Sequence, residues 1–399
     1  MVLDNEESTN PRVTLELYSI VGRQLLQLAL NRVNTTTKQI GELNSFARDT
    51  ANAVFARPKP GRKSEKGKKA WVVAEGQGEF VAIRRGPARG VRLFVKEIVD
   101  NREVIGKGGR GGGNDVILLH GMFGNTFSWR KVERDLGNIF GGRIVNVDWP
   151  PFGLSEVGVD VDLDKLYEDE GGVGMLREIV RLKRLKDVVV ISHSLSGGMG
   201  LRVGSEDWVK GIVLVTPAVV LGDGGWVGRA VGGFLGIPGV APRVMGERVR
   251  RMASDEAWEK RILKNAAAKV EADELKAMRK GYTKPIEAEG WEERLGQWVK
   301  RWHGWNLIDE MRKLKEDGSS FQAPVLIAAG DIDNVVPLEQ LRRLDAEMPS
   351  SEIQLIEKCG HIPQEEKPQE FLNLIRQWAN RRLGRESVRE NHESATIEL

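Results

Sequence analysis

Short apolar runs recur along the middle of the chain, and each is followed by glycine or polar residues. A run of four to eight apolar residues bounded by turn residues is typical of a buried strand. Segments with helical spacing of apolar residues separate several of these runs, most clearly residues 163–186. This alternation predicts an α/β fold: a mostly parallel sheet with helices on both faces and a ligand site at the carboxyl ends of its strands. The runs expected to form the sheet are residues 116–119, 143–147, 188–190, 211–216, 324–329 and 351–356. Residues 80–84 and 91–99 are expected to precede them as an antiparallel hairpin.

The alternation stops over residues 218–306, a stretch of roughly ninety residues, where loops in α/β proteins usually take about 2–6. It contains an apolar, glycine-punctuated segment, 226–245, and helical patterns at 255–280 and 290–302. We interpret it as a helical cap inserted over the sheet. Its tryptophans either hold a small subdomain together or line a substrate passage.

The first seventy residues have a different character. Residues 13–56 show helical spacing, and residues 57–69 form a linker rich in proline, glycine and lysine. The helical arm either packs on the parent domain or contacts a membrane surface or a partner. The expected organisation is an arm and basic linker at 1–70, a first core part at 71–217, the cap at 218–306, a second core part at 307–383 and a disordered tail at 384–399.

Composition excludes several classes of function. The net charge of +3 and the pI of about 8.8 are mild, and the basic residues are spread along the chain, so no nucleic-acid partner is indicated. The single cysteine, Cys359, excludes an internal disulfide and a cysteine-built metal site, and five histidines are too few and too far apart for a zinc cluster. The glycine-rich segment 107–113 lacks the Lys-Ser/Thr ending of a phosphate-binding loop. We therefore expect no metal and no cofactor.

The beginning of the chain is acidic and polar, unlike a secretory signal. No apolar run approaches the ~20 residues that a spanning helix needs. An intracellular protein, cytoplasmic or organellar and not secreted, is expected, with peripheral membrane contact through the arm or the cap as one alternative.

A serine is placed at a sharp bend directly after the apolar run 188–190. To present a serine hydroxyl at the tip of a strand-to-helix turn, the residues two before and two after it must be small, as in Gly-x-Ser-x-Gly. Here Ser192 and Ser196 fill the two glycine positions around Ser194. Taken alone, this pentapeptide is also compatible with an ordinary serine-rich turn.

Two further motifs precede this serine in the chain. His120-Gly121-Met122-Phe123-Gly124 follows the strand at 116–119, and Asp148-Trp149-Pro150-Pro151-Phe152-Gly153-Leu154-Ser155 follows the strand at 143–147. Together with His193-Ser194-x-small-Gly, in this order, they resemble the α/β-hydrolase superfamily, in its serine-nucleophile branch with a cap. Residues 281–285 and 290–291 are similar to the cap of plant plastid-type α/β-hydrolases.

The resemblance assigns roles to particular residues. Ser194 is the expected nucleophile and His361 the base, since the other histidines lie beside the serine, in the glycine turn, in the cap and in the tail. The orienting carboxylate is Asp333, with Asp331 as its competitor, and either aspartate could instead cap the following helix. The N–H groups of Met122 and Leu195 are expected to form the oxyanion hole. His120 is expected to bond loop backbone.

These residues predict a serine hydrolase that cleaves a carboxylic ester through an acyl-enzyme intermediate. The apolar start of the cap indicates a small, lipophilic ester as substrate. Two alternatives stay open: a ligand-binding or receptor-type protein with little turnover, and an acyltransferase or lyase that uses the same three residues.

Overall fold

The computed structural model describes most of the chain between residues 78 and 384. The described ranges are 78–98, 113–221, 246–247, 249–251, 253, 271–301, 304–316 and 323–384. The expected arm and linker, the tail from residue 385 and the apolar cap segment 226–245 lie outside the described residues.

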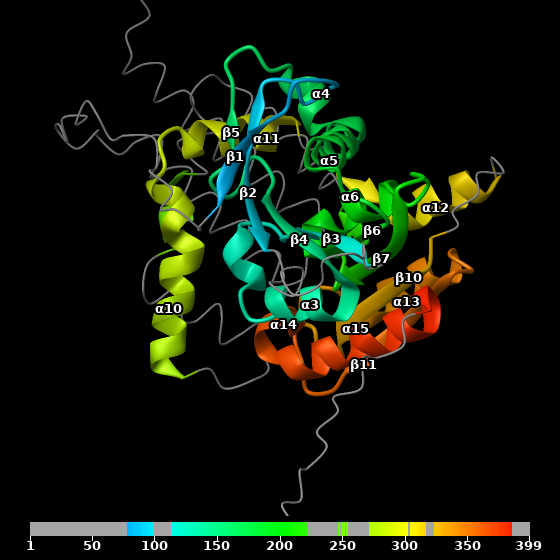
Figure 1. Cartoon of the computed structure of the whole chain (residues 1–399). Coiled ribbons are helices and arrows are strands. Elements are labelled where there is room, and N and C mark those ends of the chain that lie inside the picture. Colours follow the sequence, from blue (N-terminus) through cyan, green and yellow to red (C-terminus); the bar gives the residue numbers. More distant parts are fainter. Residues whose placement is uncertain are drawn as a thin grey trace, which may run out of the picture.

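The predicted α/β fold is confirmed: the described residues form a mostly parallel sheet of nine strands with helices packed on it (Figure 1). Five strands in the spatial order β4-β3-β6-β7-β10 are continued by β11, and all neighbours in this group pair in parallel. At the other edge β2 pairs antiparallel with β4, β1 and β5. The strands are β1 (Glu79–Ala82), β2 (Val91–Ile98), β3 (Asn114–Leu119), β4 (Gly141–Asp148), β5 (Glu156–Val157), β6 (Val188–His193), β7 (Val209–Val215), β10 (Val325–Gly330) and β11 (Ser351–Ile356).

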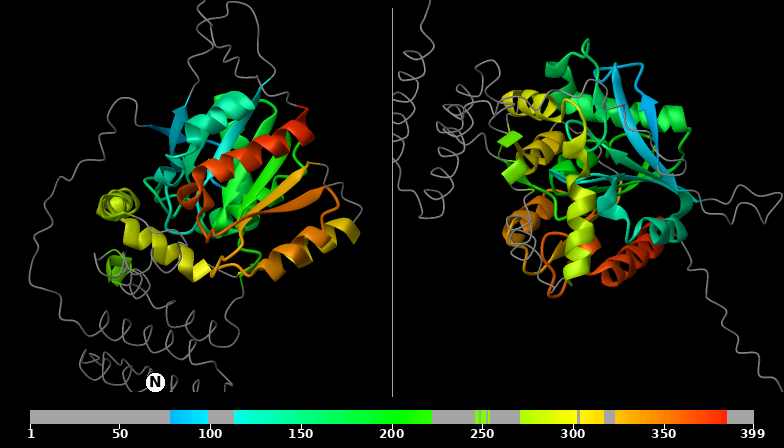
Figure 2. Two further views of the ribbon diagram at one scale, coloured as in Figure 1. Left: turned by 90° about the horizontal axis from the view of Figure 1, so that it is seen from below. Right: turned by 90° about the vertical axis from the view of Figure 1, so that its left-hand side faces the viewer.

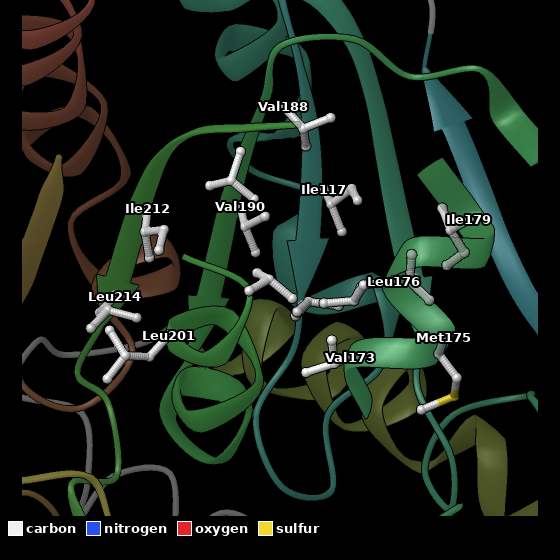
Figure 3. Close-up of a cluster of buried hydrophobic side chains, with 14 of the residues drawn as sticks. Ile117, Val173, Met175, Leu176, Ile179, Val188, Val190, Leu201, Ile212 and Leu214 are labelled. Carbon is white, nitrogen blue, oxygen red and sulfur yellow. The ribbon is translucent and has the colours of Figure 1, made fainter. Parts of the chain in front are cut away.

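Alternating side chains of the strands point to two separate cores. Ile117 and Leu119 of β3 belong to one buried cluster, and Val116 and Leu118 belong to the other. This division follows from the period of two in a strand. Figures 1 and 2 show α5 (Asp169–Lys183) and α6 (Gly197–Arg202) over one face and α3 (Glu133–Phe140) and α15 (Pro368–Leu383) over the other. Figure 3 shows the first cluster, where Leu176 of α5 and Leu201 of α6 meet valines of β6. The remaining core helices are η2 (Thr126–Trp129), α4 (Leu163–Tyr167), η3 (Ser194–Ser196), α12 (Leu307–Glu316), α13 (Leu338–Ala346) and α14 (Pro363–Glu366).

The single crossover helix predicted over residues 163–186 is wrong in detail, because the chain forms two helices there. Glu168 is extended, with ψ of 168°, and it ends α4 and precedes α5. The glycines 171, 172 and 174 lie inside α5 and are buried against Leu166, Met199 and Pro87, where a side chain would not fit without a shift. These glycines let α5 pack closely against its neighbours. The break between the two helices lies before them, at Glu168.

The predicted cap contributes three described helical segments, α10 (Ala272–Thr283), η4 (Lys284–Glu287) and α11 (Trp291–Arg301). The short strands β8 (Val220–Leu221) and β9 (Trp305–Asn306) pair antiparallel, so the two ends of the insertion are joined by a small sheet. Trp298 belongs to a buried cluster with Trp149 and Phe152 of the core, at ring-centroid distances of 5.3 Å (Phe152–Trp298) and 4.9 Å (Trp149–Phe152). Within the described residues, no helix combines the length and hydropathy needed to cross a membrane.

Trp378 of α15 fills the centre of the second core and is fully buried. We expect Trp378→Ala to lower the free energy of unfolding by about 3–5 kcal/mol, because the ring leaves a cavity that neighbours fill only in part. Gln377→Ala is the matched control, since Gln377 is exposed on the same helix and a surface change of this kind stays within about 0.5 kcal/mol. Urea unfolding of the full chain measures both, and equal losses would contradict this role of Trp378.

Candidate active site

Ser194 is held in a strained backbone conformation at the end of β6. Its φ is +53°, in the left-handed region that non-glycine residues rarely adopt. Strain of this kind persists only where the surrounding structure imposes it, and it is typical of a nucleophile elbow. The chain turns at Ser194 directly into η3 and then α6, so the serine stands between a strand end and a helix start, as its motif predicts.

The two flanking serines have different environments. Ser196 Oγ accepts a hydrogen bond from the His193 N–H at 3.1 Å and lies 2.9 Å from the Leu119 carbonyl oxygen, so it links the turn after β6 to the end of β3. Ser192 is fully buried, and its Oγ has no hydrogen-bond partner in the described part of the chain. Of the three serines, Ser194 is the one that hydrogen-bonds His361 within the described part of the chain.

The structure brings Ser194, His361 and Asp333 together in one hydrogen-bonded chain. His361 Nε2 lies 3.0 Å from Ser194 Oγ, and His361 Nδ1 lies 2.8 Å from Asp333 Oδ2. Burial acts to raise the pKa of Asp333, but the His361 hydrogen bond and charge, together with the N–H groups of Val335 and Val336, outweigh it and hold this pKa below its usual value. An ionised Asp333 fixes the Nδ1–H tautomer and leaves Nε2 free to accept the serine proton.

The two competing aspartates occupy different positions. Asp333 Oδ1 accepts hydrogen bonds from the N–H groups of Val335 and Val336. Its other oxygen, Oδ2, lies against His361 Nδ1. Asp331 Oδ1 instead accepts from the N–H of Cys359, two residues before His361. The expectation that one of them caps the next helix is wrong, because Pro337 occupies the N-cap of α13 and no side chain bonds that helix start.

The glycine turn after β3 lies against Ser194. A Cβ placed on Gly121 would come 3.1 Å from Ser194 Cβ and 2.8 Å from His193 Nδ1, so only glycine lets this backbone approach so closely. Met122 follows in the same turn, and Leu195 follows Ser194 in η3. The two residues predicted to supply the oxyanion-hole N–H groups are thus direct chain neighbours of Gly121 and of Ser194.

His120 is a structural histidine, as the sequence predicted. Its Nδ1 lies 2.8 Å from the Gly121 carbonyl oxygen, and its Nε2 accepts a hydrogen bond from the Trp149 N–H at 3.3 Å. Burial lowers the pKa of His120 to about 4, so the ring is neutral at pH 7. It joins the turn after β3 to the turn after β4.

Asp148 is a buried residue of the same region for which the sequence suggested no role beyond its motif. Its two carboxylate oxygens accept hydrogen bonds from the N–H groups of Thr126, at 2.6 Å, and Leu154, at 2.7 Å. Burial raises the pKa of Asp148 to about 7 although both hydrogen bonds act to lower it. Asp148 thereby fixes two of the turns that surround the serine.

A cavity of ≈ 180 Å³ lies between the turns of the core and the cap helices. The lining residues that the structure describes include no charged side chain at neutral pH, since burial lowers the pKa of His193 to about 3. Trp291 is among them, so one cap tryptophan lines the cavity, whereas Trp298 packs in the apolar cluster. The larger apolar side chains around the cavity include Met122, Phe123, Phe152, Val249, Ile286, Trp291, Leu295 and Ile362.

The end of α10 is attached to the core by polar contacts next to this cavity; α10 runs down the left-hand side of Figure 1. The Tyr282 hydroxyl donates to Glu365 Oε1 at 2.8 Å, and Asn125 Nδ2 donates to the Gly281 carbonyl oxygen at 3.2 Å. Arg130 bonds both Glu365 and, at 2.6 Å, Glu274 of α10. Burial raises the pKa of Glu365, and the charge of Arg130 offsets this only in part. No local motif indicates this cluster, because it joins residues far apart in the chain.

Metal-binding side chains do not gather in the described ranges, where no group of three or more His, Cys, Asp or Glu residues is placed to hold an ion.

Comparison with known proteins identifies the family. The sequence pattern of the alpha/beta hydrolase family matches residues 116–374, more than half of the chain. The hydrolase YugF of Bacillus subtilis is 25% identical over 258 residues, which cover 65% of this chain and 87% of YugF. The pimeloyl-[acyl-carrier protein] methyl ester esterase of Aeromonas hydrophila is 25% identical over 272 residues, covering 66% of this chain and 95% of that enzyme. Among solved structures, a thermophilic esterase from Thermogutta terrifontis has the same fold, with a TM-score of 0.54 at 18% identity over 76% of this chain and 98% of the esterase. The chain therefore belongs to the alpha/beta hydrolase family.

Proposed function

We propose that this protein is a serine hydrolase that cleaves a carboxylic ester through an acyl-enzyme intermediate. The observation that carries the proposal is the hydrogen-bonded chain from Ser194 Oγ through His361 to Asp333, with distances of 3.0 and 2.8 Å. The strained backbone of Ser194 supports it, because strain at a serine between a strand and a helix is the mark of a nucleophile elbow.

In this mechanism Ser194 Oγ attacks the ester carbonyl carbon while His361 Nε2 takes the serine proton. Asp333 holds the Nδ1–H and stabilises the imidazolium that forms. The N–H groups of Met122 and Leu195 donate to the oxyanion of the tetrahedral intermediate. His361 then returns the proton to the leaving alcohol, and a water molecule, deprotonated by His361, hydrolyses the acyl-enzyme.

The proposed substrate is a small ester with a lipophilic acyl chain. The cavity beside the Gly121–Met122 turn has apolar walls from core and cap and no charged lining among its described residues, which favours a hydrocarbon chain over a charged one. Contact with a membrane through the arm or the cap stays a prediction, since residues 1–70 and 226–245 lie outside the described residues.

Labelling identifies the nucleophile. A fluorophosphonate is expected to form one adduct on the protein, at Ser194, and mass spectrometry of the digested protein locates it.

Ser194→Ala should reduce turnover of an activated ester by about 10⁴- to 10⁶-fold. Ser192→Ala, which removes a hydroxyl two residues away, should retain most of the turnover. An adduct on Ser192 or Ser196 contradicts the assignment. Labelling of Ser194 without turnover of any ester would instead favour the receptor-type alternative.

Two amide substitutions distinguish the roles of Asp333 and Asp331. Asp333→Asn should lower kcat by about 10⁴-fold, because the amide no longer stabilises the imidazolium or fixes its tautomer. Asp331→Asn leaves an acceptor for the Cys359 N–H and is expected to lower kcat far less. Steady-state kinetics on one activated ester compares the two, and a larger loss for Asp331→Asn would exchange their roles.

An ester series from C2 to C12 tests the substrate class. Each methylene that enters the apolar cavity contributes about 0.8 kcal/mol, so kcat/KM should rise by about fourfold per added carbon until the cavity is full. Ile286→Trp, which narrows the cavity, should shift the preferred length toward shorter chains. Glu287→Trp is the matched control, because Glu287 is exposed on the same short helix. A preference for acetate over every longer chain would reject the lipophilic substrate.

A further inference from the structure

The backbone carbonyl of His361 is held by two buried side chains that the mechanism above does not use. His193 Nε2 lies 2.9 Å from the His361 carbonyl oxygen, and Thr216 Oγ1 donates to the same oxygen at 3.0 Å. A carbonyl oxygen only accepts hydrogen bonds, so His193 Nε2 carries the proton in this contact. Two donors therefore occupy both lone pairs of one oxygen on the residue that carries the candidate base.

Both donors start from neighbouring strand ends. His193 is the last residue of β6 and pairs with Val215 of β7, and Thr216 comes next in the chain. Both side chains are buried, at 7% and 0% exposure. Their positions are fixed by the sheet, because the Thr216 N–H donates to the Ala328 carbonyl of β10 at 2.9 Å.

Thr216 has an unusual backbone. Its φ is +42°, although a β-branched residue is a genuine outlier in the left-handed region. Such strain is found where the surroundings over-determine a conformation and is concentrated at functional sites. Here the strained residue directs its hydroxyl to the His361 carbonyl.

His193 also contacts the other parts of the site. It directly precedes Ser194, its ring centroid lies 5.1 Å from that of His361, and its Nδ1 faces the place where Gly121 would carry a side chain. One neutral ring thus lies between the nucleophile, the base and the glycine turn.

We propose that His193 and Thr216 are positioning residues that clamp the His361 carbonyl and thereby set the distance of the imidazole from Ser194 and Asp333. The inference rests on the proposed function. Loss of the clamp lets the loop at His361 shift, and both hydrogen bonds of the imidazole depend on that loop. A displacement of this kind lengthens the two hydrogen bonds of the imidazole and weakens proton transfer.

The variants remove or keep each donor. Thr216→Val removes the hydroxyl at nearly equal volume, and Thr216→Ser keeps it. His193→Leu removes the ring donor, and His193→Gln offers an amide N–H at a similar reach. We expect Thr216→Val and His193→Leu each to lower kcat by about three- to tenfold, since one hydrogen bond is lost and the other donor still satisfies the oxygen. The Ser and Gln variants should recover most of that loss.

The double variant His193→Leu/Thr216→Val is the decisive case. With no donor left the carbonyl is buried and unsatisfied, so kcat should fall by more than the product of the two single losses. A double variant that retains kcat within twofold of the wild type overturns the clamp. So does a loss that Thr216→Ser and His193→Gln fail to recover. Should the double variant fail to fold, the comparison of Thr216→Val with Thr216→Ser decides alone.

A spectroscopic measurement separates this inference from the proposed function. The chain has five histidines, so ¹⁵N-histidine labelling gives few resonances, and His361→Gln assigns the one of interest. The Nδ1 proton of His361, bonded to Asp333, should shift upfield in Thr216→Val and return toward the wild-type position in Thr216→Ser. This result does not require turnover. Absence of a Ser194 adduct would refute the proposed function, and an unmoved Nδ1 resonance would refute the clamp.

Discussion

The parallel hydrogen-bonded register of the central strands is the constraint on which the site depends. Leu119 pairs with Ser192, His193 with Val215, and Gly330 with Ile356. Parallel strands bring their carboxyl ends to one edge of a sheet. Two turns that are 167 residues apart in the chain therefore place Ser194 Oγ 3.0 Å from His361 Nε2. A slip of one residue would turn the side chains at these strand ends to the opposite face. The relative positions of the residues at these strand ends therefore depend on the register of strand pairing.

Much of this architecture follows from local patterns. The apolar runs locate the central strands because a strand buried on both faces must be continuously apolar, and the serine and histidine turns are recognisable by their flanking residues. Asp333 and Asp331 carry the same side chain, so the sequence separates them only through the family resemblance, whereas in the folded chain Asp333 bonds His361 and Asp331 bonds the Cys359 N–H. The break at Glu168 escaped prediction because it depends on tertiary packing of the neighbouring glycines. His193 and Thr216 bond a backbone carbonyl, a partner that every residue offers, so sequence gives no sign of that contact.

Buried polar groups connect the turns that surround the serine. Asp148 binds the turns at Thr126 and Leu154, and His120 joins Gly121 to Trp149. Each of these groups would be costly to bury alone, and each has backbone partners that only the native arrangement supplies. These bonds tie together the turns after β3 and β4, two of the turns that surround Ser194.

The contact between α10 and η2 bears on how such caps can be exchanged between proteins. Gly281 faces the Phe127 ring so closely that an added Cβ would come within 2.5 Å of it, and Tyr282 meets both Phe127 and Glu365. The two surfaces fit only as a set. A foreign cap helix with a larger residue in place of Gly281 would force the Phe127 ring to move, and one without a tyrosine in place of Tyr282 would leave Glu365 without this hydroxyl donor. Transplantation of this cap therefore has to keep both residues or carry η2 and the segment at Glu365 with it.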